Sequence, residues 1–363
     1  MEFKNLSELL VVPVQNIVKV TTEADVVSLL NERDNSGQHI VYRPFGGRHS
    51  WAPSVTLASQ TRATKTILLD TSELKDRKGP QMFQIGGEHY IRMGPGVTQG
   101  EMANAAALKG RALPMTGAVQ QSIRVGGFLA AGCHGTGDSP PVSEYVVAIR
   151  IVLQNRGLVG HGLFGPVIFT NLNNLPDNIT GNAPVINNFQ LLGWKPSASY
   201  AEASIMDFVR VHFGCLGIVT EYIIATVTQF YVNAADEVVP LERVLPRPDV
   251  QSSAFADMFT KYDYLELFYH PFNKMVHDLP VSGDIMLKHA VKFKGKPIFS
   301  CRRMTDPLDF RKLPLRNLSS DLSMKAVVPI FNASDLNPEV LEVTLAILKA
   351  NILQSNGSMP LFS

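Results

Sequence analysis

The sequence predicts an α+β protein of two domains, and three observations support this prediction. The 363 residues suffice for two domains of about one to two hundred residues each. The opening alternates short apolar runs with a helical pattern, and prolines gather at 239–248, with two further apolar strands beyond. We therefore expect a first domain over 1–232, with subdomains of about 1–75 and 76–232, and a second domain over 233–363.

The opening has a β-α-β pattern. Residues 17–20 form an apolar run that predicts a strand. Thr22 and Asp25 have the spacing of a capping box, which predicts that a helix begins here. Residues 39–44 and 66–70 are apolar runs that predict the next two strands.

The middle of the chain contains a helix, a strand and a long polar stretch. An Ala-rich helix is expected at about 98–109, ended by Gly110. A strand is expected at about 145–153. Residues 157–200 are rich in Asn, Pro and Gly, which predicts a loop insertion.

A second helix is expected at about 200–213. Its apolar period places Ile205, Phe208, Val209 and His212 on one face. The remaining elements are strands at 217–232, 264–269 and 285–293, and a helix that begins at Asn337 and Pro338.

The charge balance, the cysteine spacing and the lack of long apolar runs exclude several classes of protein. The 33 Lys and Arg nearly cancel the 32 Asp and Glu, so we expect neither nucleic acid nor an acidic membrane as a partner. The cysteines at 133, 215 and 301 lack the CxxC spacing of zinc or redox sites. The sequence has no signal-peptide pattern and no apolar run of roughly 18 residues. We expect a soluble, cytoplasmic protein without a membrane span.

The first glycine-rich segment, residues 45–51, directly follows a predicted strand. Gly46 and Gly47 allow a sharp turn that presents backbone N–H groups to an anion such as a pyrophosphate. His49 on this turn could ligate a metal, act as a base, form a covalent bond or be an ordinary surface histidine. The sequence lacks an HxH or HExxH pair, so we predict no metal site.

Two more small-residue segments follow. The second segment, 125–137, has five glycines and two alanines, so a ligand could lie almost against its backbone. Its spacing is neither GxGxxG nor GxxxxGK[ST], which excludes the usual NAD and P-loop patterns. Close packing of strands and turns is the alternative explanation. The third segment, 214–221, is a small-residue turn that opens a strand.

The three segments, taken in order, resemble the FAD-binding PCMH-type domain of the vanillyl-alcohol-oxidase superfamily over residues 10–230. Val97-Thr98 and Glu101 also match the usual helix start between the first two segments. The resemblance implies a two-subdomain FAD-binding domain followed by an α+β substrate (cap) domain with an antiparallel sheet. It implies that FAD is bound by Pro44, Gly46, Gly47, Arg48, His49, Ser50, Gly117, Ala118, Ser122, Val125, Gly126, Gly127, Ala131, Gly132, His134, Gly135, Ile218 and Val219.

Within the superfamily, the phrase at 49–53 is similar to that of the covalently flavinylated cholesterol oxidases. Shorter likenesses occur at 265–272, 294–297 and 356–362. The resemblance implies that His49 is joined to the 8α carbon of the flavin.

The same resemblance implies an FAD-dependent alcohol oxidase. Such an enzyme transfers a hydride from a secondary alcohol, here a sterol, to the flavin, and O2 then reoxidises the flavin and yields H2O2. Oxidases of sugar alcohols or aldonolactones share this FAD domain and are an alternative. A flavin-binding paralogue or fragment without turnover is a second alternative, and a structural protein without flavin is a third.

Glu266 corresponds to a carboxylate near the flavin, and we predict it as the catalytic residue. Its neighbours Leu265, Leu267 and Phe268 would desolvate it on a buried face and raise its pKa into the range of a base. Because residues alternate along a strand, an outward-pointing Glu266 is the alternative.

The C-terminal part departs from the family. No Glu-x-Arg pair occurs within 264–363, and the nearest pattern is Asp309-Phe310-Arg311. The terminal segment that completes the flavin domain is also missing. We therefore expect a chain truncated at its C-terminus, with an incomplete cap domain.

Overall fold

The computed structural model describes residues 2–5, 11–13, 16–31, 39–50, 64–75, 79–113, 122–135, 139–153, 165–192, 203–240, 254–269, 284–293 and 301–303. The chain divides into two compact units. The first comprises Met1–Lys109, Ser122–Cys133 and Pro141–Val227, and the second comprises Gly110–Gln121, His134–Pro140 and Thr228–Ser363. The structure is of the α+β class, as predicted.

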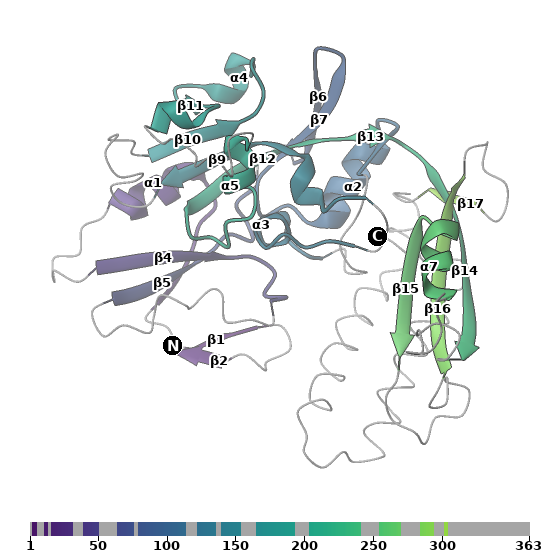
Figure 1. Cartoon of the computed structure of the whole chain (residues 1–363). Helices are drawn as coiled ribbons and strands as arrows, with labels where there is room; N and C mark the ends of the chain where they lie inside the picture. Colours follow the sequence, from purple (N-terminus) through teal and green to yellow (C-terminus); the bar gives the residue numbers. More distant parts are fainter. Residues whose placement is uncertain are drawn as a thin grey trace. The chain divides into compact units, whose positions relative to one another are not determined.

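A three-stranded parallel sheet begins the first unit. Its strands are β3 (Asn16–Lys19), β5 (Thr64–Asp70) and β4 (His39–Phe45), in that order, with α1 (Glu23–Asn31) between β3 and β4 in the chain. Figure 1 shows β4 and β5 side by side. The predicted β-α-β opening is therefore confirmed. The short strands β1 (Glu2–Lys4) and β2 (Val11–Pro13) form a separate antiparallel pair.

The predicted capping box begins α1. The Thr22 N–H donates to Asp25 Oδ2 at 2.9 Å, and the Asp25 N–H donates to Thr22 Oγ1 at 3.1 Å. The Thr21 N–H also donates to Asp25 Oδ2 at 2.9 Å. Hydrogen bonds from the Thr21 and Thr22 backbones favour the ionised carboxylate and lower the Asp25 pKa to about 2.

This lowered pKa predicts a loss of stability in acid. The native carboxylate binds its proton less readily than the unfolded one, so its contribution is complete above about pH 4 and is lost as the pH falls to about 2. Between these pH values we expect the free energy of unfolding to fall by about 1 kcal/mol more in the wild-type chain than in Asp25→Asn. This is the magnitude expected of a helix cap near solvent. Urea unfolding at several pH values measures this difference, and parallel pH profiles would contradict the prediction.

A mixed six-stranded sheet forms the second layer of the first unit. Its order is β11 (Val185–Ile186), β10 (Gly165–Thr170), β9 (Val146–Leu153), β12 (Gly217–Ala225), β7 (Glu88–Met93) and β6 (Gln81–Ile85). β10 and β11 pair parallel, and the other neighbours pair antiparallel. The helices of this unit are α2 (Gln99–Ala107), α3 (Val125–Ala130), α4 (Asp177–Thr180) and α5 (Ile205–Val209), with the 3-10 turns η2 (Val142–Tyr145) and η3 (Phe189–Leu192).

Two expectations for this layer were wrong. Part of the predicted loop at 157–200 instead forms β10, α4, β11 and η3, because the apolar side chains of Val167, Ile168 and Phe169 are buried when β10 pairs with β9. The helix predicted at 200–213 is only the five residues of α5. Phe208 is 44% exposed and does not share the buried face. Its ring instead meets Phe189 edge-on at 5.1 Å.

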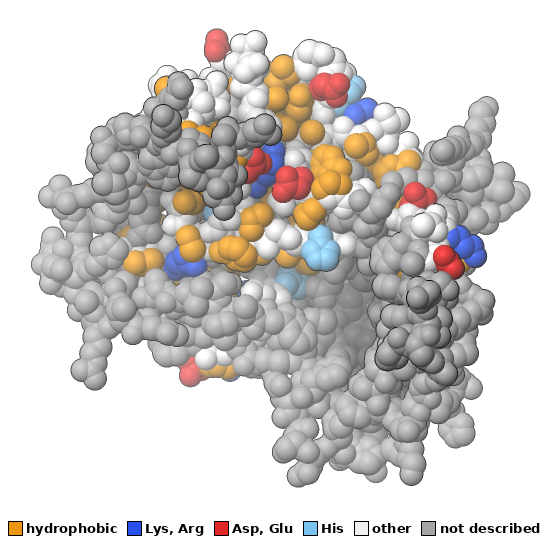
Figure 2. All heavy atoms as spheres, viewed as in Figure 1, with side chains coloured by type: hydrophobic (Ala, Val, Ile, Leu, Met, Phe, Trp, Pro, Cys, Tyr) orange, Lys and Arg blue, Asp and Glu red, His pale blue; other side chains and the backbone are white. Residues whose placement is uncertain are grey.

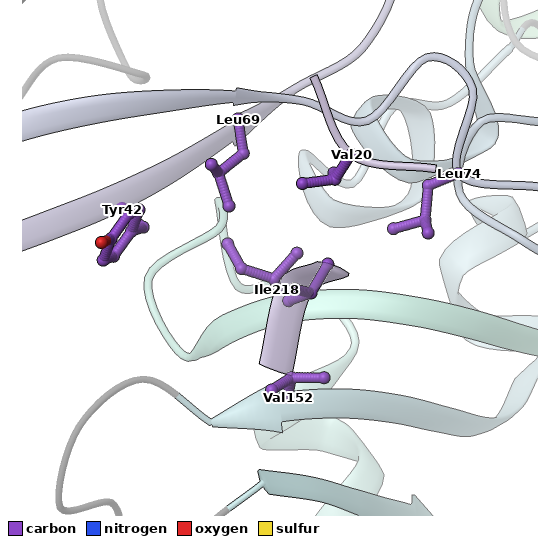
Figure 3. Close-up of a cluster of buried hydrophobic side chains, with 7 residues drawn as sticks. Val20, Tyr42, Leu69, Leu74, Val152 and Ile218 are labelled. Atoms are coloured by element: carbon purple, nitrogen blue, oxygen red, sulfur yellow. The ribbon is translucent and has the colours of Figure 1, made fainter. Parts of the chain in front are cut away.

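The main core lies between the two sheets. Figure 3 shows Val20, Tyr42, Leu69, Leu74, Val152 and Ile218 pointing toward one another from the three-stranded sheet, the turn after β5, and strands β9 and β12. Val26 of α1 completes this cluster. Burying branched side chains of this kind stabilises the native state by about 1.5–3 kcal/mol each. The cluster therefore fixes the three-stranded sheet against the start of β12.

Polar contacts join the same two layers. Arg150 on β9 donates to both carboxylate oxygens of Glu23 on α1, at 2.6 and 2.8 Å. The Thr220 hydroxyl on β12 donates to Glu23 Oε2 at 2.6 Å. Burial alone would raise the Glu23 pKa, but the hydrogen bonds from Arg150 and Thr220 outweigh it, and the pKa is lowered. Glu23 therefore stays ionised and holds α1 to the six-stranded sheet.

The second unit contains a four-stranded antiparallel sheet, as predicted for the cap domain. Its order is β15 (Tyr264–Tyr269), β16 (Asp284–Phe293), β14 (Tyr231–Pro240) and β17 (Cys301–Arg303), with α7 (Ala254–Lys261) before β15. The strand predicted at 217–232 is divided into β12, β13 (Val227–Thr228) and the start of β14. β13 pairs with β8 (Arg111–Ala112). The helix predicted after Asn337 lies outside the described residues. In the described part of the chain, no helix has the length and apolarity of a membrane span.

Candidate functional site

The first segment turns sharply after β4 and packs against the second. A methyl group at Gly46 would lie 2.9 Å from Cβ of Arg124, and one at Gly47 would lie 3.6 Å from the Ser122 carbonyl oxygen. Contacts under 3.0 Å are too close for a real Cβ, so Gly46 has no room for a side chain. Gly46 was predicted from the sharp turn, and it is also required because Arg124 lies so close to it.

The imidazole of His49 folds back over this turn. A methyl group at Gly47 would lie 2.8 Å from Cδ2 and 3.2 Å from Nε2 of His49. His49 is half-buried, whereas Arg48 and Ser50 on either side of it are exposed. The imidazole thus lies against the glycine turn rather than extending into solvent.

The second segment begins as helix α3. The Val125 and Gly126 N–H groups donate to the carbonyl oxygens of Val97 and Pro95, at 2.8 and 2.9 Å. These two amides are therefore occupied by the 95–97 turn rather than available to a pyrophosphate. Gly126 also packs tightly, because a methyl group there would lie 2.7 Å from Cβ of Pro95. Gly127 differs, since it is exposed and a methyl group there would meet no atom within 4 Å.

A turn at Pro95 and Gly96 packs against the start of α3. A methyl group at Gly96 would lie 2.6 Å from the Ser72 carbonyl oxygen. Arg124, the N-cap residue of α3, donates from Nη1 to the Gly96 carbonyl oxygen at 2.7 Å. Arg124 therefore contacts this turn with its guanidinium and the first segment with its Cβ.

The turn leading into the third segment contacts both other segments. The Phe213 N–H donates to the Ala130 carbonyl oxygen at 3.0 Å, and Val211 lies 3.2 Å from a methyl group placed on Gly132. A methyl group at Gly214 would lie 2.9 Å from Cγ of Pro44. Phe213 and Gly214 both have positive φ angles, 50° and 69°, so the chain reverses sharply here.

Arg43 on β4 holds this turn in place. It is 6% exposed, and its guanidinium donates to the carbonyl oxygens of Phe213 and Gly214 at 3.1 and 3.3 Å. A third contact joins Nη1 to Cys215 Sγ at 3.1 Å. The planar fork of an arginine suits several acceptors at once.

A buried histidine supports the turn from inside. His212 Nδ1 accepts the Gly214 N–H at 3.0 Å, so the proton of the neutral ring is on Nε2, which lies 3.4 Å from the Tyr222 hydroxyl. Burial, and then the nearby charge of Arg43, lower the His212 pKa to about 4. The ring is therefore neutral near pH 7 and acts as a hydrogen-bond acceptor. Burial also raises the Tyr222 pKa.

These contacts bring the three segments together in space. Gly46 of the first lies against Arg124, which precedes the second. Ala130 and Gly132 of the second meet Phe213 and Val211, which precede the third. Gly214 of the third lies against Pro44, which precedes the first. His49 lies where the first two segments meet. Stretches of chain separated by up to about 170 residues of sequence are thus held together.

The other predicted residues have different positions. Ile218 is fully buried in the main core and Val219 is 5% exposed, so their side chains pack inside the unit. Ala131 is the exposed C-cap residue of α3. Gly117 and Ala118 lie outside the described residues. His134, Gly135 and Glu266 belong to the second unit, where Glu266 lies opposite Lys288 on β16.

Sequence reasoning missed the residues that hold the segments together. Arg43, Gly96 and Arg124 were not among the predicted site residues. An arginine inside the apolar run 40–45 was the available signal for Arg43, because a buried cation needs partners. On the face drawn in Figure 2, the described Lys and Arg side chains lie apart from one another, and some of them lie beside Asp or Glu side chains. The described residues contain no cluster of three or more metal-binding side chains.

Comparison with known proteins agrees with this geometry. Residues 14–161 match the family described as FAD binding domain. A variant of the cholesterol oxidase from Brevibacterium sterolicum, with one histidine replaced by alanine, superposes with a TM-score of 0.62 at 16% identity, covering 98% of this chain and 59% of that chain. The B. sterolicum cholesterol oxidase itself gives 0.59 at 16% identity, with 96% and 59% covered. A solvent-stable cholesterol oxidase gives 0.64 at 17% identity, with 98% and 59% covered.

The chain therefore contains an FAD binding domain and shares the fold of these oxidases. It spans about three fifths of their length. No curated protein matches the sequence.

Proposed function

We propose that this chain, which contains an FAD binding domain, is a covalent flavoprotein that oxidises an alcohol. The observation that carries the proposal is the set of close contacts that joins the three glycine-rich segments through the residues just before them, with His49 packed against Gly47. Backbone lined by glycines lets a flat, elongated cofactor approach closely. A structural role alone would explain the tightly packed Gly46 and Gly126, but not an exposed Gly127 beside them.

The residues present fit FAD. Gly127 is exposed, and the space beside it that a side chain would fill is open. Of the first residues of α3, Val125 and Gly126 use their N–H groups within the protein, so they would contact FAD through packing. The backbone from Gly46 to Arg48, in which the two glycines are half-buried and Arg48 is exposed, would supply polar contacts to the pyrophosphate.

His49 would be the attachment residue, and its bond to the flavin would prevent the cofactor from dissociating. When bound, FAD supplies a hydride acceptor and passes the electrons to O2, yielding H2O2. A sterol is the proposed substrate, because the three solved structures with this fold bear the name cholesterol oxidase. A sugar alcohol or aldonolactone is the second candidate, because such oxidases share the FAD domain.

Glu266 is the proposed base for the hydroxyl proton. It lies on β15, and a desolvated carboxyl group there would have the raised pKa that a base needs.

The test is whether flavin stays with the protein in acid. We expect acid-precipitated wild-type protein to retain flavin absorbance and His49→Ala to release all of it. His89→Ala is the matched control, because His89 is also half-buried but lies on β7, outside the three segments. Flavin retained by acid-precipitated His49→Ala would contradict the assignment.

The substrate is tested with the same protein. Cholesterol, xylitol and a gulonolactone are each supplied, and H2O2 is measured. Peroxide with cholesterol alone supports the sterol oxidase, and peroxide with xylitol or the lactone supports the second candidate. Yellow protein that yields no H2O2 with any alcohol would mean a flavin-binding protein without turnover. Colourless protein that takes up no FAD would exclude a flavoprotein.

A further inference from the structure

Arg48, the residue before His49, has an unusual backbone conformation. Its φ is 60°, and among the described residues the other non-glycine residue with positive φ is Phe213. A residue with a Cβ is disfavoured in this left-handed region, and such outliers cluster at functional sites. Arg48 lies on the turn that follows β4. Phe213 lies on the turn that Arg43 of β4 contacts.

The side chain of Arg48 lies over the ring of Phe45. Its guanidinium lies 5.5 Å from the centroid of the Phe45 ring, a distance at which a cation is attracted to the ring face. Phe45 is 5% exposed and packs with Phe3 and Leu68 in the core beneath the three-stranded sheet. The anchored side chain therefore helps to hold residue 48 in its left-handed conformation.

The conformation of residue 48 decides where the next side chain points. A left-handed residue reverses the chain locally, whereas the ordinary helical or extended regions would direct residue 49 elsewhere. In this structure the Cδ2–Nε2 edge of His49 faces Gly47, and a methyl group there would lie 2.8 Å from Cδ2. The imidazole is thereby held against the first segment.

We propose that Arg48 is a positioning residue for flavin attachment, which rests on the proposed function. Its left-handed backbone aims the imidazole of His49 at the 8α carbon of FAD. Attachment forms one bond between an imidazole nitrogen and that carbon. The imidazole N–H and the 8α methyl group each lose one proton, and the electron pair of the broken C–H bond reduces the flavin ring. Dioxygen then takes the electron pair and two protons and becomes H2O2.

The experiment compares variants that lack the guanidinium and differ in their tolerance of positive φ. FAD is added to the full-length apoprotein of wild type, Arg48→Gly and Arg48→Ala. The rate at which flavin becomes acid-resistant is measured beside the affinity for FAD before attachment, followed by flavin fluorescence. We expect Arg48→Gly to attach FAD at nearly the wild-type rate and Arg48→Ala about fivefold more slowly, because only glycine enters the left-handed region freely. The affinity measured before attachment separates an effect on FAD binding from an effect on the attachment rate.

Arg48→Pro extends the series, because proline fixes φ near −65° and excludes the left-handed conformation. We expect it to bind FAD but to attach it at least tenfold more slowly than wild type. Equal attachment rates in Arg48→Gly and Arg48→Ala would overturn the inference, even if Arg48→Pro did not fold. An Arg48→Gly rate as low as that of Arg48→Pro would also overturn it, because the guanidinium and not the backbone would then be responsible. Wild-type protein that binds FAD without ever forming acid-resistant flavin would instead contradict the proposed covalent link.

Discussion

Replacing Gly127 with valine is expected to weaken FAD binding by about tenfold to a hundredfold while leaving the fold intact. A side chain at this position would meet no protein atom within 4 Å of its Cβ, so it would enter the volume assigned to the cofactor. Overfilling an occupied volume costs about 1–3 kcal/mol. Glycine is also the poorer helix former, so valine in α3 should leave the melting temperature of the apoprotein unchanged or slightly higher.

Titration of the apoprotein with FAD, paired with thermal unfolding, measures both quantities. Ala24→Val is the matched control, since it adds similar bulk at an exposed position of α1. Gly126→Ala is expected to destabilise the fold itself, because its methyl group would lie 2.7 Å from Cβ of Pro95. Unchanged FAD affinity in Gly127→Val would show that the open space beside α3 does not receive the cofactor.

Arg43→Met is expected to lower the free energy of unfolding by about 3 kcal/mol or more. The substitution keeps an apolar stem of similar length but removes the donors to the carbonyl oxygens of Phe213 and Gly214. Buried acceptors left without a donor cost about 1–3 kcal/mol each, and hydrogen bonds from charged groups are worth about 1.5–3 kcal/mol. The released turn should also reduce the amount of flavin incorporated, because Gly214 in this turn packs against Pro44 before the first segment.

Urea unfolding of the two proteins measures this cost. Lys75→Met is the control, because it removes a partly exposed ion pair with Glu101, which should be worth no more than about 1 kcal/mol. Arg43→Lys should fall between wild type and Arg43→Met, since an ammonium group keeps the charge but cannot reach all the acceptors at once. Arg43→Met as stable as Lys75→Met would contradict the assigned role.

The glycine pattern allowed the close contacts of the candidate site to be predicted from sequence. Glycines at 46, 126 and 214 mark places where another part of the chain approaches closely, and the structure has neighbouring atoms at each of them. The capping box at Thr22 and the strand at 39–44 were predictable because they depend on local contacts. The antiparallel sheet of the second unit, in contrast, came from the family resemblance, and pairing such as that of β14 with β17 has no local signal.

Long-range contacts explain what the sequence did not reveal. Arg43 meets acceptors about 170 positions away, and no local pattern relates the two. β10 lies in a stretch whose Asn and Pro content suggested a loop, yet its pairing with β9 buries Val167, Ile168 and Phe169. The direction of His49 depends on the φ of Arg48, which sequence alone does not give.

The most direct test of the central claim is peptide mapping of the purified protein by mass spectrometry. The protein is digested, and the peptide containing His49 is compared with the same peptide from His49→Ala. We predict that the wild-type peptide carries the added mass of a flavin on the imidazole. If the peptide is unmodified in protein that is yellow, the three segments hold the cofactor without this bond. If the protein takes up no flavin at all, they do not form an FAD site.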